Sequence, residues 1–441
     1  MWTYHPELLA VPVPRYTSFP TAAEFGEGVG AKELATALEG ENGEISLYVH
    51  IPFCEKICWY CGCNTSVANR TDRVTSYLDA LHQEIALVAE RLPKAAKVTR
   101  IAFGGGSPNG ISPIDFVRIV DALTLEFGIQ SEGKRPVISI ELDPRTLGAG
   151  WAAVIGAVGI SRASLGVQTF DDGLQEAIGR VQPAHMIEES TAMLRSAGVQ
   201  SLNFDLMYGL PGQTEANLRD SLERAVALGA DRIALFGYAH VPHLIARQRK
   251  IDDSALPDAE TRFRMAALGY EYLVDQGYVP VGFDHFARPG DALAQATLSG
   301  TLRRNFQGFT EDQAPVLIGL GASAISSFPG LLVQNEKNAG RYRMMLSQNR
   351  LTAERGIVRT AEDRRRGEVI EALLCRGRAR VESDLWNEAY PLLQPYLDTG
   401  LCQVDDQDLV IPPGGLPYAR SIAARFDPYR KDSLRRFSSA V

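Results

Sequence analysis

The chain has 441 residues, of which 45% are hydrophobic and 22% are charged, a composition typical of globular proteins. Its formal net charge of −8 argues against a general nucleic-acid or membrane-surface binder. No stretch reaches the roughly 20 apolar residues of a membrane helix, and the N-terminal residues lack a basic segment followed by an apolar run. We therefore expect a cytoplasmic protein that works without nucleic acid or a membrane.

Short β-branched and apolar runs recur along the first two thirds of the chain and predict strands. These runs cover residues 45–51, 98–104, 137–142, 162–167, 201–206, 232–238 and 278–283. Amphipathic helical patterns lie between them at 72–92, 214–228 and 259–276, and Asp72 and Thr214 are the expected N-caps of the first two. Strands that alternate with helices at this spacing predict parallel βα units in a barrel or partial barrel.

The last part of the chain has a different pattern. Residues 360–375 are typical of a helix, and residues 409–429 predict a short strand, a turn and another helix. We expect a small helical module with a strand pair, of winged-helix type. Such modules often bind DNA, but the acidic balance of the chain favours a lid or packing role. The expected divisions are an N-terminal extension (1–43), a barrel with its C-terminal elaboration (44–355) and a C-terminal domain (356–441).

Four of the six cysteines lie within ten residues, directly after the first predicted strand. Cys54, Cys58 and Cys61 have the spacing C-x3-C-x2-C, and Cys63 follows. In a cytoplasmic protein, clustered cysteines indicate metal binding or catalysis more often than disulfides. Three thiolates on one short loop favour an iron–sulfur cluster that leaves one iron open. A zinc site that recruits Cys63 as a fourth ligand is the alternative.

Further polar segments follow the other predicted strands. The stretch "FGGGSPN" (103–109) allows close approach of the backbone to a ligand, although such a stretch is more often only a tight turn. Glu141, Gln168 and Asp205 lie at the ends of later strands, where they bind either a ligand or a barrel loop. Arg180 is suited to two-pronged pairing with a carboxylate.

Two segments combine aromatic and basic residues, at 283–289 and 303–310, and residues 246–251 form a small basic cluster. Aromatic walls with cations suit a flat ligand that bears carboxylates. Packing with a salt bridge explains the segments 283–289 and 303–310 equally well. For the basic cluster "ARQRKI", a solvated helix face is the favoured interpretation, and service to such a ligand is the alternative.

The C-x3-C-x2-C spacing after the first strand of a βα barrel resembles the radical S-adenosylmethionine (SAM) superfamily. The resemblance implies a 4Fe–4S cluster on Cys54, Cys58 and Cys61, whose open iron binds SAM for reductive cleavage to a 5′-deoxyadenosyl radical. It also implies the fold class: α/β, a partial (β/α)6-type barrel with an N-terminal extension and a small, mostly helical C-terminal domain.

Longer segments narrow this resemblance. "RYTSFPTAAEF", "LYVHIPFCEKICWYCGCN", "NFDLMYGLPGQT" and "RNFQGFT" resemble the oxygen-independent coproporphyrinogen III oxidase (dehydrogenase) family. That family implies oxidative decarboxylation of two propionates of coproporphyrinogen III to vinyl groups, giving protoporphyrinogen IX. It also implies two SAM molecules per chain, an unidentified reductant and electron acceptor, and a monomer.

Carried over position by position, the resemblance implies three sets of site residues besides the cluster ligands. The cluster-bound SAM is expected to contact Tyr48, Gly105, Glu141 and Ile325. The second SAM is expected to contact Tyr60, Gly106, Ser107, Gln168, Arg180, Asp205 and Ala239. The residues expected at the reaction itself are Cys63, Phe306 and Gln307.

Two groups of proteins related to this family have other functions: haem-binding or trafficking proteins, and radical SAM haem methyltransferases. The haem-trafficking relatives generally lack the fourth cysteine and the "RYTSFPTA" segment. This chain has both features, so the decarboxylating enzyme is the favoured interpretation.

Overall fold

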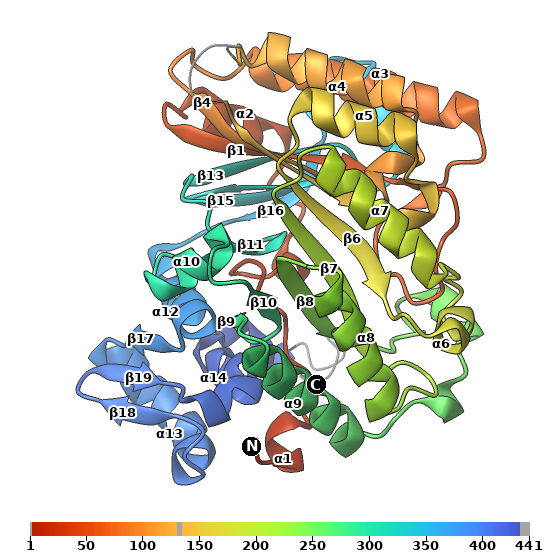
Figure 1. Ribbon diagram of the computed structural model, residues 1–441. Coiled ribbons are helices and arrows are strands. Elements are labelled where there is room, and N and C mark those ends of the chain that lie inside the picture. The colour runs from red at the N-terminus through yellow and green to blue at the C-terminus, as the bar shows by residue number, and fades with distance from the viewer. Residues whose placement is uncertain (1, 130–134, 433–441) are drawn as a thin grey trace.

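The computed structural model describes residues 2–129 and 135–432 and is built around six βα units (Figure 1). Their strands are β1 (Glu44–Ile51), β4 (Lys97–Gly105), β5 (Val137–Leu142), β6 (Arg162–Gln168), β7 (Ser201–Tyr208) and β8 (Arg232–Gly237). Their helices are α3 (Thr71–Ala89), α4 (Pro113–Glu126), α5 (Ala149–Val158), α7 (Ala184–Ser196), α8 (Glu215–Ala227) and α9 (Ala259–Asp275). The predictions of parallel strands and intervening helices are confirmed for these units.

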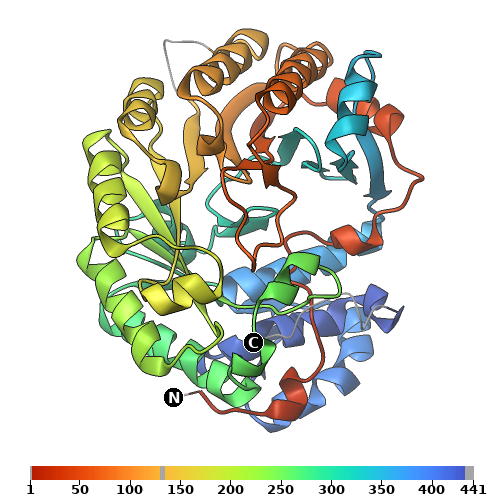
Figure 2. The same cartoon turned by 90° about the vertical axis from the view of Figure 1, so that its right-hand side faces the viewer.

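The six strands lie side by side and parallel in chain order, and the helices form an arc outside them (Figure 2). Apolar side chains of strands and helices meet between the two layers in one large core. This arrangement is the α/β partial barrel that was expected.

The sheet extends beyond the six strands at both edges. Beside β1 lies β13 (Val316–Leu320), which is parallel to it. Three more strands follow, each antiparallel to the strand before it in the sheet: β14 (Ile325–Phe328), β15 (Leu331–Asn335) and β16 (Ala353–Val358). Beside β8 lies the antiparallel pair β10 (His285–Ala287) and β9 (Val279–Val281). Because β16 and β9 end the sheet without pairing to each other, the barrel is open.

Three details differ from the predictions. The strand expected at 278–283 is only β9, because the chain turns after Val281 to form the β9–β10 hairpin. The N-cap of α3 is Arg70, whereas Asp72 lies in the first turn, where a carboxylate complements the helix dipole. The four strands β13–β16 were not predicted. By contrast, Thr214 caps α8 as expected, since its hydroxyl accepts a hydrogen bond from the Asn217 N–H.

Short elements connect or flank the barrel. They are α1 (Pro6–Leu9), α2 (Ala31–Glu39), β2 (Phe53–Cys54), β3 (Ser66–Val67), α6 (Asp172–Ala177), α10 (Ala292–Leu298), β11 (Arg303–Asn305), β12 (Gly308–Thr310) and α11 (Ala339–Leu346). Within the described residues, none of the helices has both the length and the apolar character needed to cross a membrane.

The C-terminal region follows β16. It contains α12 (Ala361–Arg376), β17 (Arg378–Arg380), α13 (Ser383–Asp398), β18 (Gln403–Asp405), β19 (Asp408–Val410) and α14 (Ala419–Ala423). Its sheet has three strands in the order β17-β19-β18, rather than the expected strand pair. Its core includes Val13 and Tyr16 of the N-terminal segment, whereas Leu34 and Leu38 of α2 join the barrel core. The described part of the N-terminal extension, residues 2–43, therefore divides between two cores.

Candidate active site

The carboxyl ends of β1 and β4–β8 surround a cavity of about 540 Å³, which we call the cysteine cavity. Residues from the loops after six strands meet in its wall. Most of the site residues expected from the sequence line it, namely Cys54, Cys58, Tyr60, Cys61, Cys63, Gly105, Gly106, Ser107, Glu141, Gln168, Arg180, Asp205 and Ala239.

The cysteine loop is held at both of its ends. Phe53 and Cys54 form β2, which pairs with β3 and so brings the two ends of the loop together. The Cys54 thiol lies 3.2 Å from the Thr65 hydroxyl, and the Trp59 N–H donates a hydrogen bond to the Ile178 carbonyl at 3.0 Å. The four cysteines differ in exposure: Cys58 is buried, Cys54 and Cys61 are intermediate, and Cys63 is an exposed residue that lines the cavity.

Hydrogen-bond donors surround the sulfur atoms. Cys58 Sγ accepts from Arg145 Nη2 at 3.4 Å and from Arg180 Nη1 at 3.2 Å. Cys61 Sγ accepts from the Cys63 N–H at 3.4 Å. Hydrogen bonding from Cys63 is the main cause that lowers the pKa of the Cys61 thiol to about 6, against the opposing effect of burial. These hydrogen bonds favour the thiolate of Cys61, the form that binds a metal, whereas burial raises the pKa of the Cys54 thiol.

The donor set of this loop fits an iron–sulfur cluster. Three thiols with the C-x3-C-x2-C spacing face one cavity, and cationic side chains border the sulfur of Cys58. Three cysteine ligands leave one iron of a 4Fe–4S cluster open to a further ligand. Among the described residues, no three or more His, Cys, Asp or Glu side chains are gathered closely enough to hold a single metal ion.

One buried carboxylate, that of Asp143, holds the two arginines beside Cys58. Arg145 Nη2 lies 2.6 Å from Asp143 Oδ2, and Arg180 Nη2 lies 3.3 Å from Asp143 Oδ1. Burial raises the pKa of Asp143, but the two guanidinium groups outweigh burial and hold this pKa below its usual value. Arg145 also donates to the Lys56 carbonyl at 3.1 Å. The network therefore fastens the cysteine loop to the end of β5.

Both edges of the Arg180 guanidinium are engaged by the protein. Its Nε and Nη2 donate to the Gly166 carbonyl at 3.1 and 2.6 Å, and its other edge faces Cys58 and Asp143. The expected two-pronged pairing of Arg180 with a ligand carboxylate does not fit this arrangement.

The glycine-rich segment packs against the cysteine loop. The Gly106 N–H donates to the Ile51 carbonyl at 2.9 Å, and the Ser107 N–H donates to the Phe53 carbonyl at 2.8 Å. A Cβ added to Gly106 would lie 2.6 Å from the Phe53 carbonyl oxygen. These two amides therefore bind protein acceptors, and Gly106 is required because the two loops approach so closely.

Two carboxylates at strand ends face the cysteine cavity. Glu141 Oε2 accepts from the Gly105 N–H at 3.3 Å. Asp205 accepts from the Ser164 hydroxyl at 3.0 Å and from Asn203 Nδ2 at 2.8 Å. Burial, and then the charge of Asp205, raises the pKa of Glu141 to about 7. Carboxylates in this position suit the hydroxyl or ammonium groups of a bound ligand.

Four of the expected site residues lie outside the wall of the cysteine cavity. Tyr48 lies on β1, with its hydroxyl 3.1 Å from His50 Nδ1, and Ile325 lies on β14. Gln307 lines a second cavity of about 300 Å³, the barrel cavity, which shares Glu141 and Asp205 with the first. Phe306 lines a separate cleft next to the N-terminal segment.

The basic segment "ARQRKI" covers the cysteine loop. Gln248 is buried, and its Nε2 donates to the carbonyls of Tyr60 and Ala239 at 3.0 Å each. Arg247 donates to the Cys63 carbonyl at 3.2 Å. The prediction of a solvated face is therefore wrong for Gln248 and Arg247. The sequence marked the segment as basic but not these contacts, because hydrogen bonds to a distant loop leave no periodic pattern.

An open parallel barrel with a three-cysteine loop at the carboxyl ends of its strands defines a radical SAM protein. The sequence profile of the Radical SAM superfamily matches residues 48–225. Proteins of this class bind a 4Fe–4S cluster and SAM.

Relatives define the family more closely. The chain is 40% identical over 440 residues to the oxygen-independent coproporphyrinogen III oxidase of Bradyrhizobium diazoefficiens, with 97% of each chain covered. It is 36% identical over 443 residues to that of Escherichia coli, with 97% of this chain and 96% of the relative covered. The solved structure of coproporphyrinogen III oxidase from Escherichia coli matches with a TM-score of 0.90 at 35% identity, covering 97% of this chain and 99% of the other. The chain belongs to the oxygen-independent coproporphyrinogen III oxidase family.

Proposed function

We propose that this protein converts coproporphyrinogen III to protoporphyrinogen IX without oxygen, by oxidative decarboxylation of two propionates to vinyl groups. Each conversion removes one hydrogen atom, one electron and carbon dioxide from a propionate side chain. The observation that carries the proposal is the four-cysteine loop on a 540 Å³ cavity, in a chain that matches the coproporphyrinogen III oxidases over 97% of its length.

The proposed cofactors are a 4Fe–4S cluster and two SAM molecules per chain. When bound, they supply a 5′-deoxyadenosyl radical that abstracts a hydrogen atom from the substrate. Cys54, Cys58 and Cys61 are the proposed ligands, which is supported by their common cavity. Arg145 and Arg180 place positive charge beside Cys58, which offsets the negative charge that thiolate ligands bring.

The proposed SAM contacts form two groups. Those of the cluster-bound SAM are Tyr48, Gly105, Glu141 and Ile325. Those of the second SAM are Tyr60, Gly106, Ser107, Gln168, Arg180, Asp205 and Ala239. Support comes from the shared cavity wall, which includes every residue of the second group and two of the first.

Cys63, Phe306 and Gln307 are proposed to act on the substrate. Cys63 is an exposed residue that lines the cysteine cavity, which supports contact with a bound molecule. Gln307 lines the adjoining barrel cavity, and Phe306 is included as its neighbour in the chain.

The test is anaerobic reconstitution of the cluster, followed by addition of SAM, a low-potential reductant, an electron acceptor and coproporphyrinogen III. We expect vinyl product and carbon dioxide. SAM cleavage without either product would show that the assignment is wrong. For a Cys63→Ser variant we expect unchanged cluster absorbance and lost turnover, whereas loss of the cluster would make Cys63 a ligand.

The wider setting is also proposed. We expect a cytoplasmic monomer that receives electrons from a separate reductant and passes them to a separate acceptor. Residues 356–441 are proposed to be a C-terminal domain with a lid or packing role. Size-exclusion chromatography and limited proteolysis test the monomer and the domain boundary.

A further inference from the structure

Arg145 lines the cysteine cavity, yet the proposed function gives it no contact with SAM or with the substrate. It follows Asp143 at the end of β5, in a single 3-10 turn that spans Pro144–Thr146. Asp143 caps this turn, because its Oδ1 accepts from the Arg145 N–H at 3.0 Å. The proline ring fixes the backbone φ of the first residue of the turn. The local sequence therefore brings the Arg145 side chain back beside Asp143.

The backbone of Asp143 is held from a second side. Asn109 is buried, donates from Nδ2 to the Asp143 carbonyl at 2.8 Å and accepts from the Asp143 N–H at 3.0 Å. Asn109 belongs to the glycine-rich segment, whose Ser107 N–H donates to the Phe53 carbonyl at the start of the cysteine loop. The turn that carries Arg145 is therefore fixed relative to the cysteine loop.

The Arg145 guanidinium divides its hydrogen bonds between oxygen atoms and a sulfur atom. Its Nη2 lies 2.6 Å from Asp143 Oδ2, 3.1 Å from the Lys56 carbonyl and 3.4 Å from Cys58 Sγ. Arg180 donates to the same sulfur from Nη1 at 3.2 Å. The side chains of Arg145, Arg180 and Asp143 are 12%, 8% and 6% exposed, so solvent screens their charges little.

Cys58 differs in its donors from the other two expected ligands. The Cys54 thiol lies 3.2 Å from the neutral Thr65 hydroxyl, and Cys61 Sγ accepts from the neutral Cys63 N–H at 3.4 Å. By contrast, both donors to Cys58 Sγ are guanidinium groups. A hydrogen bond from a charged group is roughly twice as strong as one from a neutral group. Cys58 is therefore the ligand at which the protein acts most strongly on a bound cluster.

Arginines at the other end of the strands have carboxylates as partners. Near the amino ends of β4, β6 and β8, three arginines form ion pairs with three carboxylates: Arg100, Arg162 and Arg232 with Asp291, Glu311 and Asp312. Both groups are partly or fully buried ion-pair networks. The group beside the cysteine loop differs because an expected cluster ligand is a further acceptor in it.

The charges beside Cys58 act on reduction with opposite signs. Hydrogen bonds to the ligand sulfurs and the net charge nearby help to set the reduction potential of an iron–sulfur cluster. Gaining an electron makes the cluster more negative, so a neighbouring cation stabilises the reduced form and raises the potential. A neighbouring anion lowers the potential for the same reason. Arg145 and Arg180 therefore raise it, and Asp143 lowers it.

We propose that Arg145 acts through Cys58 to set the reduction potential of the cluster, and that Asp143 limits this effect. The inference rests on the proposed function, which places the cluster on Cys54, Cys58 and Cys61. By raising the potential, Arg145 makes the cluster easier for a separate reductant to reduce. By offsetting part of that charge, Asp143 keeps the reduced cluster a strong donor toward SAM. Arg145 is thus a positioning residue that tunes electron transfer.

The test is a redox titration of the reconstituted protein, in which cluster absorbance and electron paramagnetic resonance report the fraction that is reduced. The variants are Arg145→Gln, Arg145→Lys and Asp143→Asn. Asn keeps the oxygen that caps the turn, so Asp143→Asn removes charge with little change of shape. Hydrogen exchange of residues 54–63 in the cluster-free protein reports whether the cysteine loop keeps its place.

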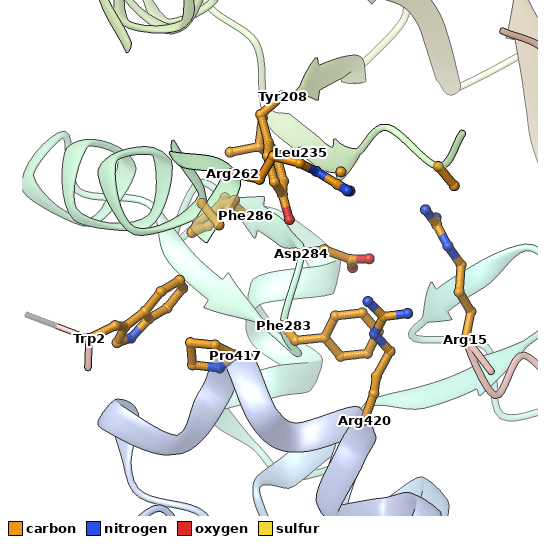
Figure 3. A pocket seen from close by; sticks show the side chains of 13 residues that line it. Trp2, Arg15, Tyr208, Leu235, Arg262, Phe283, Asp284, Phe286, Pro417 and Arg420 are labelled. Atoms are coloured by element: carbon orange, nitrogen blue, oxygen red, sulfur yellow. The ribbon is translucent and has the colours of Figure 1, made fainter. Parts of the chain in front are cut away.

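The matched control is Arg262→Gln, which also removes a guanidinium group near the cysteine cavity. Figure 3 shows Arg262 at a smaller pocket of about 50 Å³, which Arg15 and Arg420 also line. The Nη2 atom of Arg262 donates to the Tyr238 carbonyl at 2.8 Å, at the end of β8. Because Arg262 lies outside the wall of the cysteine cavity, its loss should change the reduction equilibrium less than about twofold.

We expect Arg145→Gln to shift the one-electron reduction equilibrium about tenfold toward the oxidised cluster, or about 59 mV, because a charged hydrogen bond to sulfur is lost. Arg145→Lys keeps the charge and should shift the equilibrium less than about threefold. Asp143→Asn should shift it about tenfold toward the reduced cluster. A displaced loop would shift both Gln and Asn variants in one direction and would speed hydrogen exchange, so opposite signs separate charge from position.

Two results would overturn the inference. One is a shift of the same sign in Arg145→Gln and Asp143→Asn, and the other is a shift in Arg145→Gln no larger than that of the Arg262→Gln control. If Arg145→Gln takes up no cluster, Asp143→Asn still decides, because an unchanged or lowered potential in that variant contradicts a role for its charge.

The titration requires neither SAM nor coproporphyrinogen III, so its outcome is separate from the proposed function. If the wild-type protein takes up no cluster, both are wrong. If it takes up a cluster but forms no vinyl product, only the proposed function is wrong. If it forms the product while the variants keep the wild-type potential, only the role of Arg145 and Asp143 is wrong.

Discussion

Asp143 connects the stability of the protein to the position of the cysteine loop. Its side chain is 6% exposed and lies within 3.3 Å of both Arg145 and Arg180. An Asp143→Asn substitution keeps the size of the side chain but leaves two neighbouring guanidinium groups without their shared counter-charge. Removing one partner of a buried ion pair costs about 3–5 kcal/mol. Because Asn keeps the oxygen that accepts from the Arg145 N–H at 3.0 Å, we expect the lower end, about 3 kcal/mol.

The effect should depend on pH with a definite sign. The pKa of Asp143 is lower in the folded protein than its usual value of 3.8, so the carboxylate contributes stability above pH 3.8. That contribution is lost as the pH falls through the folded-state pKa. The difference in unfolding free energy between wild type and Asp143→Asn should therefore be full at pH 7 and should shrink below pH 4.

The assay is urea unfolding of the cluster-free protein followed by circular dichroism. The matched control is Asp220→Asn, which removes an exposed partner of Arg224 on α8, where both side chains are about half exposed. Exposed pairs of this kind contribute about 0–1 kcal/mol. Equal losses for the two variants at pH 7, or a difference that does not shrink on acidification, would refute the reasoning.

Three further predictions concern a carboxylate at a strand end, a buried carboxylate on α3 and the packing of the cysteine loop. Burial and a neighbouring carboxylate raise the pKa of Glu141 to about 7, so this side chain becomes ionised between pH 6 and pH 8 and SAM affinity should increase over that range. Glu141→Gln should abolish this pH dependence. If the increase persists in Glu141→Gln, another group causes it. Glu84 is buried and accepts four hydrogen bonds, so Glu84→Ala should lower the unfolding free energy by about 3 kcal/mol or more. The control, Gln83→Ala at an exposed position, should lower it by about 0.5 kcal/mol. Similar values for the two variants would show that the hydrogen bonds of Glu84 do not stabilise the fold. Gly106→Ala should displace the cysteine loop and reduce the iron bound per chain, whereas Gly290→Ala, where a Cβ meets open space, should not; full iron content in Gly106→Ala would contradict the packing argument.

Much of the barrel could be predicted because local pattern and final structure agree there. The strands β1 and β4–β8 are β-branched or apolar runs, and each pairs with the next strand in the chain. The strands β13–β16 are shorter, at 4 to 6 residues, and β13 pairs with β1, more than 250 residues earlier. Local periodicity carries no information about such a pairing, so these strands could not be placed from sequence.

The site was predictable where spacing carries the chemistry. Cys54, Cys58 and Cys61 were found because three thiols on one loop need a fixed separation in sequence. Asp143 gave a weaker signal, two residues after Glu141 at the end of the same strand, and was missed. Arg15 and Arg420 gave none, because only folding brings the two ends of the chain together at one pocket.

The pairing of the arginines separates structural roles from binding roles in this molecule. At the amino ends of the strands, three arginines meet three carboxylates, and the charges cancel within the protein. Beside Cys58, Arg145 and Arg180 share one carboxylate, and the sulfur of Cys58 accepts hydrogen bonds from both. Since uncompensated buried charge is costly, the excess positive charge beside Cys58 is best explained by the thiolates that the cysteine loop brings to this side of the cavity.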